Sequence, residues 1–173
     1  MTVIVTGGAG FIGSNLILGL NMQGVTDILV VDNLGSSLKF KNLIGCEFQE
    51  YLQKDRFREL ICERRLDSHV SAIFHQGACS NTMELDGNYM IDNNYQYSAE
   101  LLDFATEKEI PFIYASSAAV YGANTQFKED RVNESPLNVY GDSNLIFDEL
   151  VRRRVDIAKS QLVGLRYCNV DGL

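Results

Sequence analysis

The glycine-rich segment near the start of the chain constrains the fold more than any other feature. Residues 3–13 read VIVTGGAGFIG, so a β-branched run leads straight into glycines, and an apolar helical pattern follows. In this context Gly7 permits a tight turn, Gly10 lets the backbone approach a pyrophosphate, and Gly13 lets the new helix pack against the strand. The helix N-terminus would offer its N–H groups to an anion. The segment predicts a dinucleotide-binding turn, and a tight strand–helix turn without a ligand is the alternative.

Apolar runs typical of strands alternate with helical patterns along the whole chain. Strands are predicted at 3–6, 27–32, 70–75, 110–115 and 162–167, and helices at 11–23, 90–107 and 138–153. Residues 35–41 read as a loop, and 47–60 as a mixed stretch that ends in a helix. This order predicts an α/β fold, a doubly wound parallel sheet that forms one Rossmann-type dinucleotide-binding domain over residues 1–173.

Composition excludes several other classes of protein. The 173 residues are 46% hydrophobic, and the net charge is 15 − 23 = −8, which argues against nucleic acid as a partner. Residues 152–154 are all arginine and read as a solvated helix end. No apolar run approaches the roughly 20 residues of a membrane span. With two histidines and no C-x-x-C pair among Cys46, Cys62, Cys79 and Cys168, no metal site is expected, and a cytoplasmic location is expected.

Polar residues follow several of the predicted strands, and the carboxyl ends of parallel strands meet at one edge of a sheet. Asp32 ends the second strand, where a carboxylate normally accepts the ribose hydroxyls of NAD and repels the 2′-phosphate of NADP. Lys39 and Lys54 lie downstream and could reach a phosphate, although each alone reads as a solvated surface charge. These residues leave the choice between NAD and NADP open.

A serine and a tyrosine are placed to form a proton-transfer pair. Ser117 follows the strand at 110–115, and Tyr140 lies near the start of the helix at 138–153. A serine hydroxyl can orient a substrate oxygen while a tyrosinate removes its proton as hydride leaves. An unperturbed tyrosine has a pKa near ~10, so this chemistry needs a nearby cation, which is expected one helical turn further on.

Together the glycine turn, the Ser117/Tyr140 pair and the segment RYCNV at 166–170 resemble the extended short-chain dehydrogenase/reductases. Five segments resemble, more narrowly, the ADP-L-glycero-D-manno-heptose 6-epimerase family: DILVVDN, IFHQGACS, DNNYQYS, YASSAA and PLNVY. That resemblance implies an NADP-dependent epimerase that oxidises and re-reduces C6 of an ADP-heptose for lipopolysaccharide core synthesis. It also implies a homo-oligomer.

The resemblance assigns roles position by position. Ser117 and Tyr140 match the catalytic hydroxyl and the tyrosine base. Cofactor contacts are implied for Gly7, Gly10, Phe11, Ile12, Gly13, Asp32, Asn33, Lys39, Lys54, Gln76, Gly77, Ala78, Cys79, Ser80, Asn93, Asn144, Asn169 and Val170. The two lysines match those that favour NADP.

Two departures from the family pattern weaken the implied activity. The family motif is Tyr-x-x-x-Lys, and here Asn144 stands in place of the lysine, so the cation is missing. A cation about 4 Å from a tyrosinate is worth up to roughly 4 kcal/mol, so we expect the chemical step to fall roughly 10–1,000-fold. The family also continues well past residue 173 with a C-terminal substrate domain, which this sequence does not contain. A catalytically lapsed dinucleotide-binding or assembly module is therefore one alternative, and another nucleotide-sugar 4-epimerase or dehydratase is a second.

Overall fold

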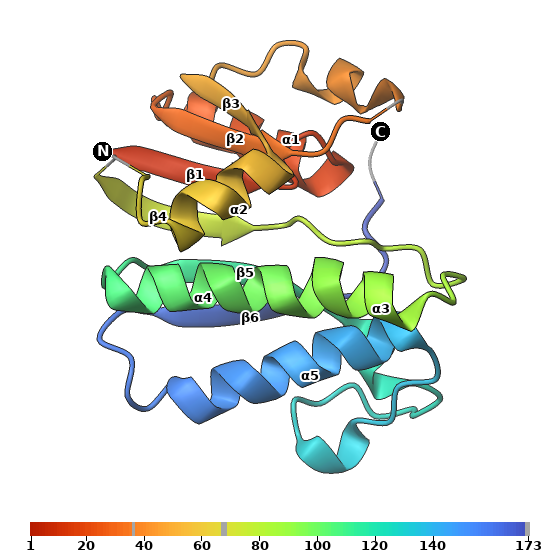
Figure 1. The fold of residues 1–173 in the computed structure, drawn as a ribbon. Coiled ribbons are helices and arrows are strands. Elements are labelled where there is room, and N and C mark those ends of the chain that lie inside the picture. Colours follow the sequence, from red (N-terminus) through yellow and green to blue (C-terminus); the bar gives the residue numbers. More distant parts are fainter. Residues whose placement is uncertain (36, 67–68, 172–173) are drawn as a thin grey trace.

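A single parallel sheet of six strands forms the centre of the computed structural model, which describes residues 1–35, 37–66 and 69–171 (Figure 1). The strand order is β3-β2-β1-β4-β5-β6, and the strands are β1 (Thr2–Thr6), β2 (Ile28–Asp32), β3 (Glu50–Gln53), β4 (Val70–His75), β5 (Phe112–Ser117) and β6 (Leu162–Tyr167). All neighbouring strands are parallel. This is the doubly wound, Rossmann-type sheet that the sequence predicts.

Helices cover both faces of the sheet. The α-helices are α1 (Phe11–Met22), α2 (Lys54–Cys62), α3 (Gly87–Met90), α4 (Tyr97–Glu107) and α5 (Val139–Arg154). Shorter helical segments are η1 (Leu38–Leu43), η2 (Ile91–Gln96), η3 (Ala118–Tyr121) and η4 (Arg131–Asn133). Helix α1 packs on one face, and α2, α4 and α5 pack on the other (Figure 1). No helix in the described ranges is long and apolar enough to cross a membrane.

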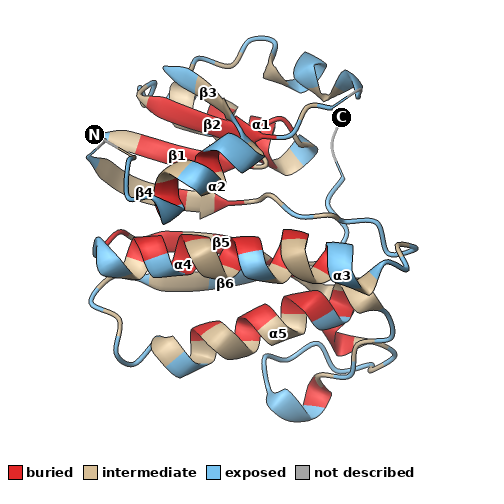
Figure 2. Cartoon of the chain, viewed as in Figure 1, coloured by how far each residue is buried: buried red, intermediate tan, exposed pale blue. Residues whose placement is uncertain are grey.

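The two faces of the sheet receive alternate side chains of the central strands, as the two-residue period of a strand requires. In β1, Ile4 packs with the α2, α4 and α5 side, whereas Val3 and Val5 pack with Ile17 of α1. All five residues of β2 are buried (Figure 2). Burial on both faces explains why the central strands read as continuous apolar runs.

Three local features differ from the sequence-based expectations. The mixed stretch at 47–60 contains a four-residue edge strand, β3, whose outer residues are exposed, so it carries no strand periodicity. The expected loop at 35–41 contains the start of η1, with residue 36 lying outside the described part of the chain. The helix expected at 90–107 begins earlier, at Gly87, and includes a π-helical segment, η2.

The arginines at the end of α5 are not simply a solvated helix end. Arg152 is paired with Glu134 and Glu149, and Arg154 with Asp103. Only Arg153 fits the prediction of an exposed, solvated charge. Long arginine side chains can reach across to neighbouring segments, which a sequence pattern does not reveal.

Candidate active site

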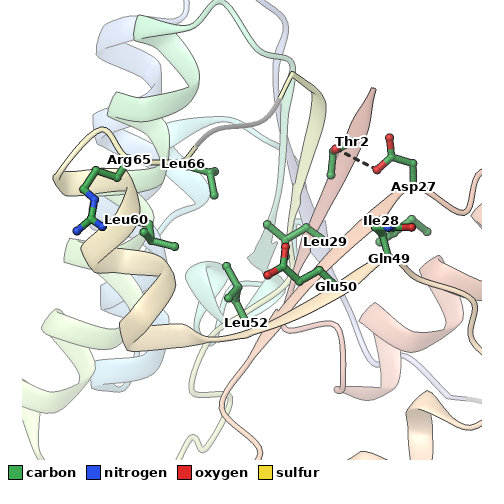
Figure 3. A pocket seen from close by; sticks show the side chains of 10 residues that line it. All are labelled: Thr2, Asp27, Ile28, Leu29, Gln49, Glu50, Leu52, Leu60, Arg65 and Leu66. Carbon is green, nitrogen blue, oxygen red and sulfur yellow. Dashed lines mark hydrogen bonds between the residues drawn. The ribbon is translucent and has the colours of Figure 1, made fainter.

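The predicted site residues gather at the carboxyl ends of the strands. A cavity of about 240 Å³ lies at the opposite, amino-terminal end of the sheet (Figure 3). Its walls contain none of the predicted site residues and are formed by Thr2, Asp27, Ile28, Leu29, Gln49, Glu50, Leu52, Leu60, Arg65 and Leu66. This cavity is therefore separate from the predicted site, whose residues follow the carboxyl ends of the strands.

The glycine turn between β1 and α1 leaves no space for a side chain at three of its positions, Gly7, Gly8 and Gly13. Gly7 has φ of +67°, and a Cβ there would lie 2.6 Å from the carbonyl carbon of Gln76 at the end of β4. A Cβ at Gly13 would lie 2.2 Å from the carbonyl oxygen of Gly7. Glycine at residue 7 therefore lets the turn pack closely against the end of β4, and glycine at residue 13 lets α1 pack closely against the turn. The extra glycine, Gly8, is also needed, because its Cβ would lie 2.8 Å from Val30.

Helix α1 begins directly at this turn and presents an uncapped N-terminus. Gly10 is the N-cap residue, no side chain within the described ranges caps the helix, and the first turn contains no acidic residue. The N–H groups of Phe11, Ile12 and Gly13 have no acceptor within an α-helix of this geometry. A close backbone approach and outward N–H groups are what a pyrophosphate requires. The residues present therefore fit the phosphates of a dinucleotide.

The carboxylate of Asp32 at the end of β2 is buried and fully engaged. Its Oδ2 accepts a hydrogen bond from the amide of Ala9 at 2.8 Å, so it braces the glycine turn. Its Oδ1 accepts from the amide of Asn33 and from Nζ of Lys39, each at 2.7 Å. Lys39 is thus an ion-pair partner of Asp32 and not an isolated surface charge.

Lys54, the first residue of α2, also reaches into the site. Its Nζ donates to Oδ1 of Asn93 at 2.7 Å and lies 5.9 Å from the ring centroid of Tyr97. Only 18% of the Lys54 side chain is exposed. The structure therefore brings Lys54 and Asn93, both predicted cofactor contacts, into direct contact.

Asn94 is a connecting residue that the sequence analysis did not identify. It lies in the π-helical segment η2, and its amide bonds both backbone groups of Cys79, at 2.8 and 3.1 Å. Its Nδ2 also lies 3.2 Å from Oγ of Ser143, whose hydroxyl donates to the carbonyl of Tyr140. Asn94 thereby joins the loop after β4 to the first turn of α5. A π-helical segment such as η2 often marks a functional site. The sequence pattern alone predicts one continuous helix here and does not reveal this interruption.

His75 at the end of β4 forms a buried polar link beneath the site. Its Nδ1 lies 2.6 Å from Oγ1 of Thr6, and its Nε2 lies 2.8 Å from Oγ of Ser98. Thr6 also accepts from the amide of Gly77, and Ser98 donates to the carbonyl of Asn94, which places the ring proton on Nε2. Burial lowers the pKa of His75 to about 3, so the ring is neutral.

The proposed proton-transfer residues lie at adjoining strand and helix ends. Ser117 is the last residue of β5, and its Oγ accepts a hydrogen bond from the amide of Ala119 at 3.1 Å. That bond leaves the hydroxyl proton of Ser117 available for a substrate oxygen. Tyr140 lies in the first turn of α5, which is capped by Asn138. Nδ2 of Asn144 donates to the carbonyl of Tyr140 at 2.8 Å, so this amide group bonds its own helix.

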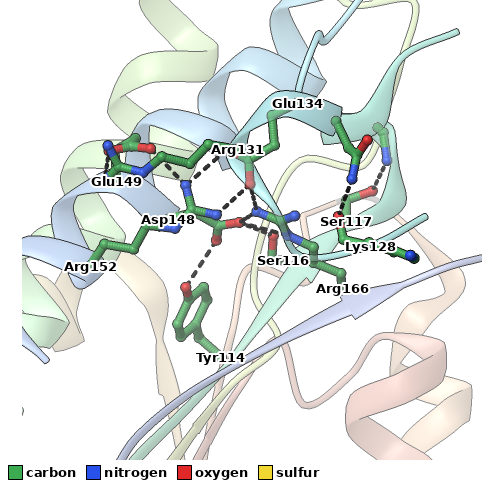
Figure 4. Close-up of polar contacts among 12 residues, drawn as sticks. Tyr114, Ser116, Ser117, Lys128, Arg131, Glu134, Asp148, Glu149, Arg152 and Arg166 are labelled. Atoms are coloured by element: carbon green, nitrogen blue, oxygen red, sulfur yellow. Dashed lines mark hydrogen bonds and ion pairs between the residues drawn. The ribbon is translucent and has the colours of Figure 1, made fainter. Parts of the chain in front are cut away.

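A buried cluster of charges lies behind Ser117 (Figure 4). Asp148 of α5 accepts hydrogen bonds from Tyr114 and Ser116 of β5, each at 2.9 Å, and from Arg166 of β6. Arg166 also pairs with Glu134, which in turn pairs with Arg152. Hydrogen bonds from these two arginines lower the pKa of Glu134 to about 2. The cluster fastens α5 and the segment before it to β5, which ends in Ser117, and to β6.

The remaining predicted contacts lie along the same edge of the sheet. Gln76 directly follows β4, and its Oε1 is buried with no hydrogen-bond partner in the described ranges. The residues after it, Gly77, Ala78, Cys79 and Ser80, continue as an irregular loop in which Ala78 and Ser80 are exposed. Asn169 and Val170 follow β6 and are exposed. Ligand contact at these positions stays a prediction.

Comparison with known proteins agrees with this geometry. Residues 3–173 match the model of the NAD dependent epimerase/dehydratase family. The chain belongs to that family.

Several solved structures share its fold. ADP-L-glycero-D-manno-heptose-6-epimerase of Helicobacter pylori is 38% identical over 97% of this chain, with a TM-score of 0.84. UDP-glucose 4-epimerase of Thermotoga maritima, solved with UDP-glucose, is 27% identical over 99% of the chain, with a TM-score of 0.83. UDP-glucose 4-epimerase of Brucella ovis, solved with NAD, is 26% identical over 97%, with a TM-score of 0.77. The chain spans 55%, 57% and 52% of these three proteins, respectively, or little more than half of each.

Proposed function

We propose that residues 1–173 form the NADP-binding domain of a nucleotide-sugar epimerase that acts on C6 of an ADP-heptose. The observation that carries this proposal is the shared edge at which the glycine turn, the Asp32–Lys39 pair and the Ser117/Tyr140 strand and helix ends all lie. The 38% identity to the Helicobacter pylori heptose epimerase favours this sugar over the others. Homo-oligomerisation and a cytoplasmic location belong to the same proposal. We also propose that residues outside these 173 complete the sugar site to which Ser117 and Tyr140 contribute.

The preference for NADP rests on the charges around Asp32. A bare carboxylate at this position repels a 2′-phosphate, and an ammonium group beside it removes that repulsion. Lys39 supplies such a group at 2.7 Å, and Lys54 lies on the same edge next to Asn93. The pairing of Lys39 with Asp32 and the presence of a second lysine on the same edge therefore support NADP over NAD.

The chemistry of the proposed reaction divides between the cofactor and two side chains. Bound NADP supplies the acceptor for a hydride from C6 and later the donor that returns it to the other face of the sugar carbon. Ser117 donates a hydrogen bond to the oxygen on C6 and holds it in place. Tyr140, as tyrosinate, accepts the hydroxyl proton when the carbonyl forms. The first turn of α1 holds the pyrophosphate, which fixes the dinucleotide relative to both residues.

One observation favours a second candidate function, a dinucleotide-binding module without turnover. Asn144 carries no charge, and its Nδ2 bonds the carbonyl of Tyr140. A tyrosinate without a neighbouring cation forms less readily, so we expect turnover by these residues to be weak. UDP-sugar 4-epimerisation is the further alternative, and the UDP-glucose 4-epimerases at 26–27% identity support it.

The experiment that separates these functions is a turnover assay with a substrate panel. The protein is incubated with NADP⁺ and either ADP-glycero-manno-heptose or UDP-glucose, and epimerisation is followed by proton NMR. Slow conversion of the ADP-heptose that Tyr140→Phe abolishes is the expected result. Conversion of UDP-glucose instead would replace the sugar in the proposal. Binding of NADP⁺ without turnover, unaltered by adding a lysine at position 144, would favour the non-catalytic module.

A further inference from the structure

The short helix η1 (Leu38–Leu43) is held against the glycine turn by two polar side chains. Nζ of Lys39 donates to Oδ1 of Asp32 at 2.7 Å. Nδ2 of Asn42 donates to the carbonyl oxygen of Ala9, in the middle of the turn, at 2.9 Å. Asn42 has no part in the site as built so far, yet it bonds the backbone of the phosphate-binding segment.

The geometry of η1 makes these two contacts depend on each other. In a 3₁₀ helix, side chains three residues apart lie on the same face, so Lys39 and Asn42 both face the turn. No residue of η1 is buried, and Leu38 and Phe40 are 66% and 51% exposed. Apart from Leu43, which packs against the side of the core that contains Ile17, the residues of η1 gain little from apolar burial, so the two polar contacts orient it toward the turn.

The contacts close a ring around a single residue of the turn. The amide of Ala9 donates to Oδ2 of Asp32, and the carbonyl of Ala9 accepts from Asn42. The backbone of η1 connects Asn42 to Lys39, and Nζ of Lys39 donates to Oδ1 of Asp32, which closes the ring. Removing the Asn42 amide opens the ring and leaves the flexible Lys39 side chain, 40% exposed, to hold the ion pair alone.

We propose that Asn42 is a positioning residue that selects the phosphorylated dinucleotide by keeping Lys39 beside Asp32. The inference rests on the proposed NADP site and adds a residue to it. With Lys39 in place, Asp32 presents no net negative charge to a 2′-phosphate. With Lys39 released, the carboxylate repels that phosphate but still accepts the ribose hydroxyls of NAD. Asn42 therefore sets the ratio of the two affinities more than either affinity by itself.

The test measures dissociation constants for NADP⁺ and NAD⁺ by isothermal titration calorimetry, at one fixed ionic strength because exposed charges are screened by salt. We expect Asn42→Ala to weaken NADP⁺ binding about tenfold, or about 1.4 kcal/mol, and NAD⁺ binding less than about threefold. Asn42→Asp keeps the size of the side chain but removes the donor, so it should weaken NADP⁺ binding at least as much. Asn42 is exposed, and circular dichroism checks that both variants fold.

A double-mutant cycle distinguishes positioning through Lys39 from a general loosening of the turn. In a Lys39→Ala background, Asn42→Ala should leave the ratio of NADP⁺ to NAD⁺ affinities unchanged, because the residue through which it acts is gone. Asn21→Ala is the matched control. Asn21 forms two 2.8 Å hydrogen bonds with the backbone of Glu47, beyond the end of η1, without touching Ala9 or Asp32. This control should also leave the ratio unchanged.

The outcomes that would overturn the inference differ from those that would overturn the proposed function. Three results would refute the role of Asn42 and leave the NADP site standing. They are an unchanged affinity ratio in Asn42→Ala, an equal loss of affinity for both nucleotides, and a change in the ratio that persists in the Lys39→Ala background. A wild-type protein that binds neither nucleotide, or prefers NAD⁺, would refute the NADP site and this inference with it.

Discussion

Nδ2 of Asn144 lies 2.8 Å from the carbonyl oxygen of Tyr140, one helical turn before it in α5. The residue that the family pattern makes a lysine is therefore an amide that bonds its own helix backbone. Both residues are near the start of the helix, next to the end of β5 where Ser117 lies. The Asn144 amide therefore stabilises the first turns of α5, but it supplies no positive charge to favour a tyrosinate at Tyr140.

Introducing that charge should strengthen the site. We expect Asn144→Lys to bind NADP⁺ more tightly and to raise epimerase turnover roughly tenfold or more, because an ammonium group can bond the ribose and favour tyrosinate. Asn144→Met is the control, since it has a similar length and no charge. Equal gains in the two variants, measured by calorimetry and NMR turnover, would show that charge is not the reason.

Two glycines of the same helix should respond in opposite ways to alanine. A Cβ at Gly13 would lie 2.2 Å from the carbonyl oxygen of Gly7, so Gly13→Ala should lower the free energy of unfolding by roughly 1–3 kcal/mol or more and abolish nucleotide binding. Gly19 has nothing within 4 Å of such an atom, so Gly19→Ala should raise stability by about 0.5–1 kcal/mol. Urea denaturation measures both. A tolerated alanine at residue 13 would contradict the close packing of α1 on the turn.

The buried histidine should make stability depend on pH. Burial lowers the pKa of His75 to about 3 in the folded state, whereas the unfolded value is 6.5. As pH falls below about 6.5, the unfolded chain binds a proton that the folded chain does not, so stability falls until about pH 3 and is fully present above 6.5. Between pH 6.5 and 5 the expected loss is about 1.5 kcal/mol.

The chain contains two histidines, which provides the control for this prediction. His69 is exposed, and His69→Gln should keep the loss of stability between pH 6.5 and 5. His75→Gln should remove most of it, whatever its effect on stability at neutral pH. Chemical denaturation at a series of pH values tests both variants. The same pH dependence in His75→Gln would show that another group is responsible.

The charge cluster behind Ser117 should contribute more to stability than a surface ion pair. Asp148 is 5% exposed and accepts bonds from Tyr114, Ser116 and Arg166, so Asp148→Asn leaves a buried guanidinium with one carboxylate fewer. We expect a loss of roughly 3–5 kcal/mol. Asp103→Asn removes the partner of Arg154 at an exposed site and should cost no more than about 1 kcal/mol. Similar unfolding midpoints for the two variants would contradict the importance of the cluster.

The parallel sheet and the glycine turn could be predicted because local sequence determines them. A β-branched run followed by Gly7 and Gly13 leaves few other folds, and the alternation of strands and helices sets the topology. The edge strand β3 was missed because four half-exposed residues carry no period. No residue of η1 is fully buried, so it leaves no apolar pattern, and its polar contacts are with side chains and backbone of other elements.

The supporting residues of the site could not be predicted for a related reason. Asp148 reads as one more charge on an amphipathic helix until Tyr114, 34 residues earlier, is seen to bond it. Asn94 and Ser143 are 49 residues apart and meet only in the folded chain. Lys39 and Lys54 each read as solvated charges in the sequence, because only the structure shows that they pair with Asp32 and Asn93.

The measurement that tests the central claim most directly is a calorimetric titration of the purified protein, residues 1–173, with NADP⁺. The account predicts one binding site per chain with an affinity in the micromolar range, on the order of −8 kcal/mol, that Gly13→Ala abolishes. A Gly19→Ala protein should bind as the wild type does. The absence of binding at millimolar NADP⁺ by the folded wild-type protein would contradict the claim that this edge of the sheet is a dinucleotide site.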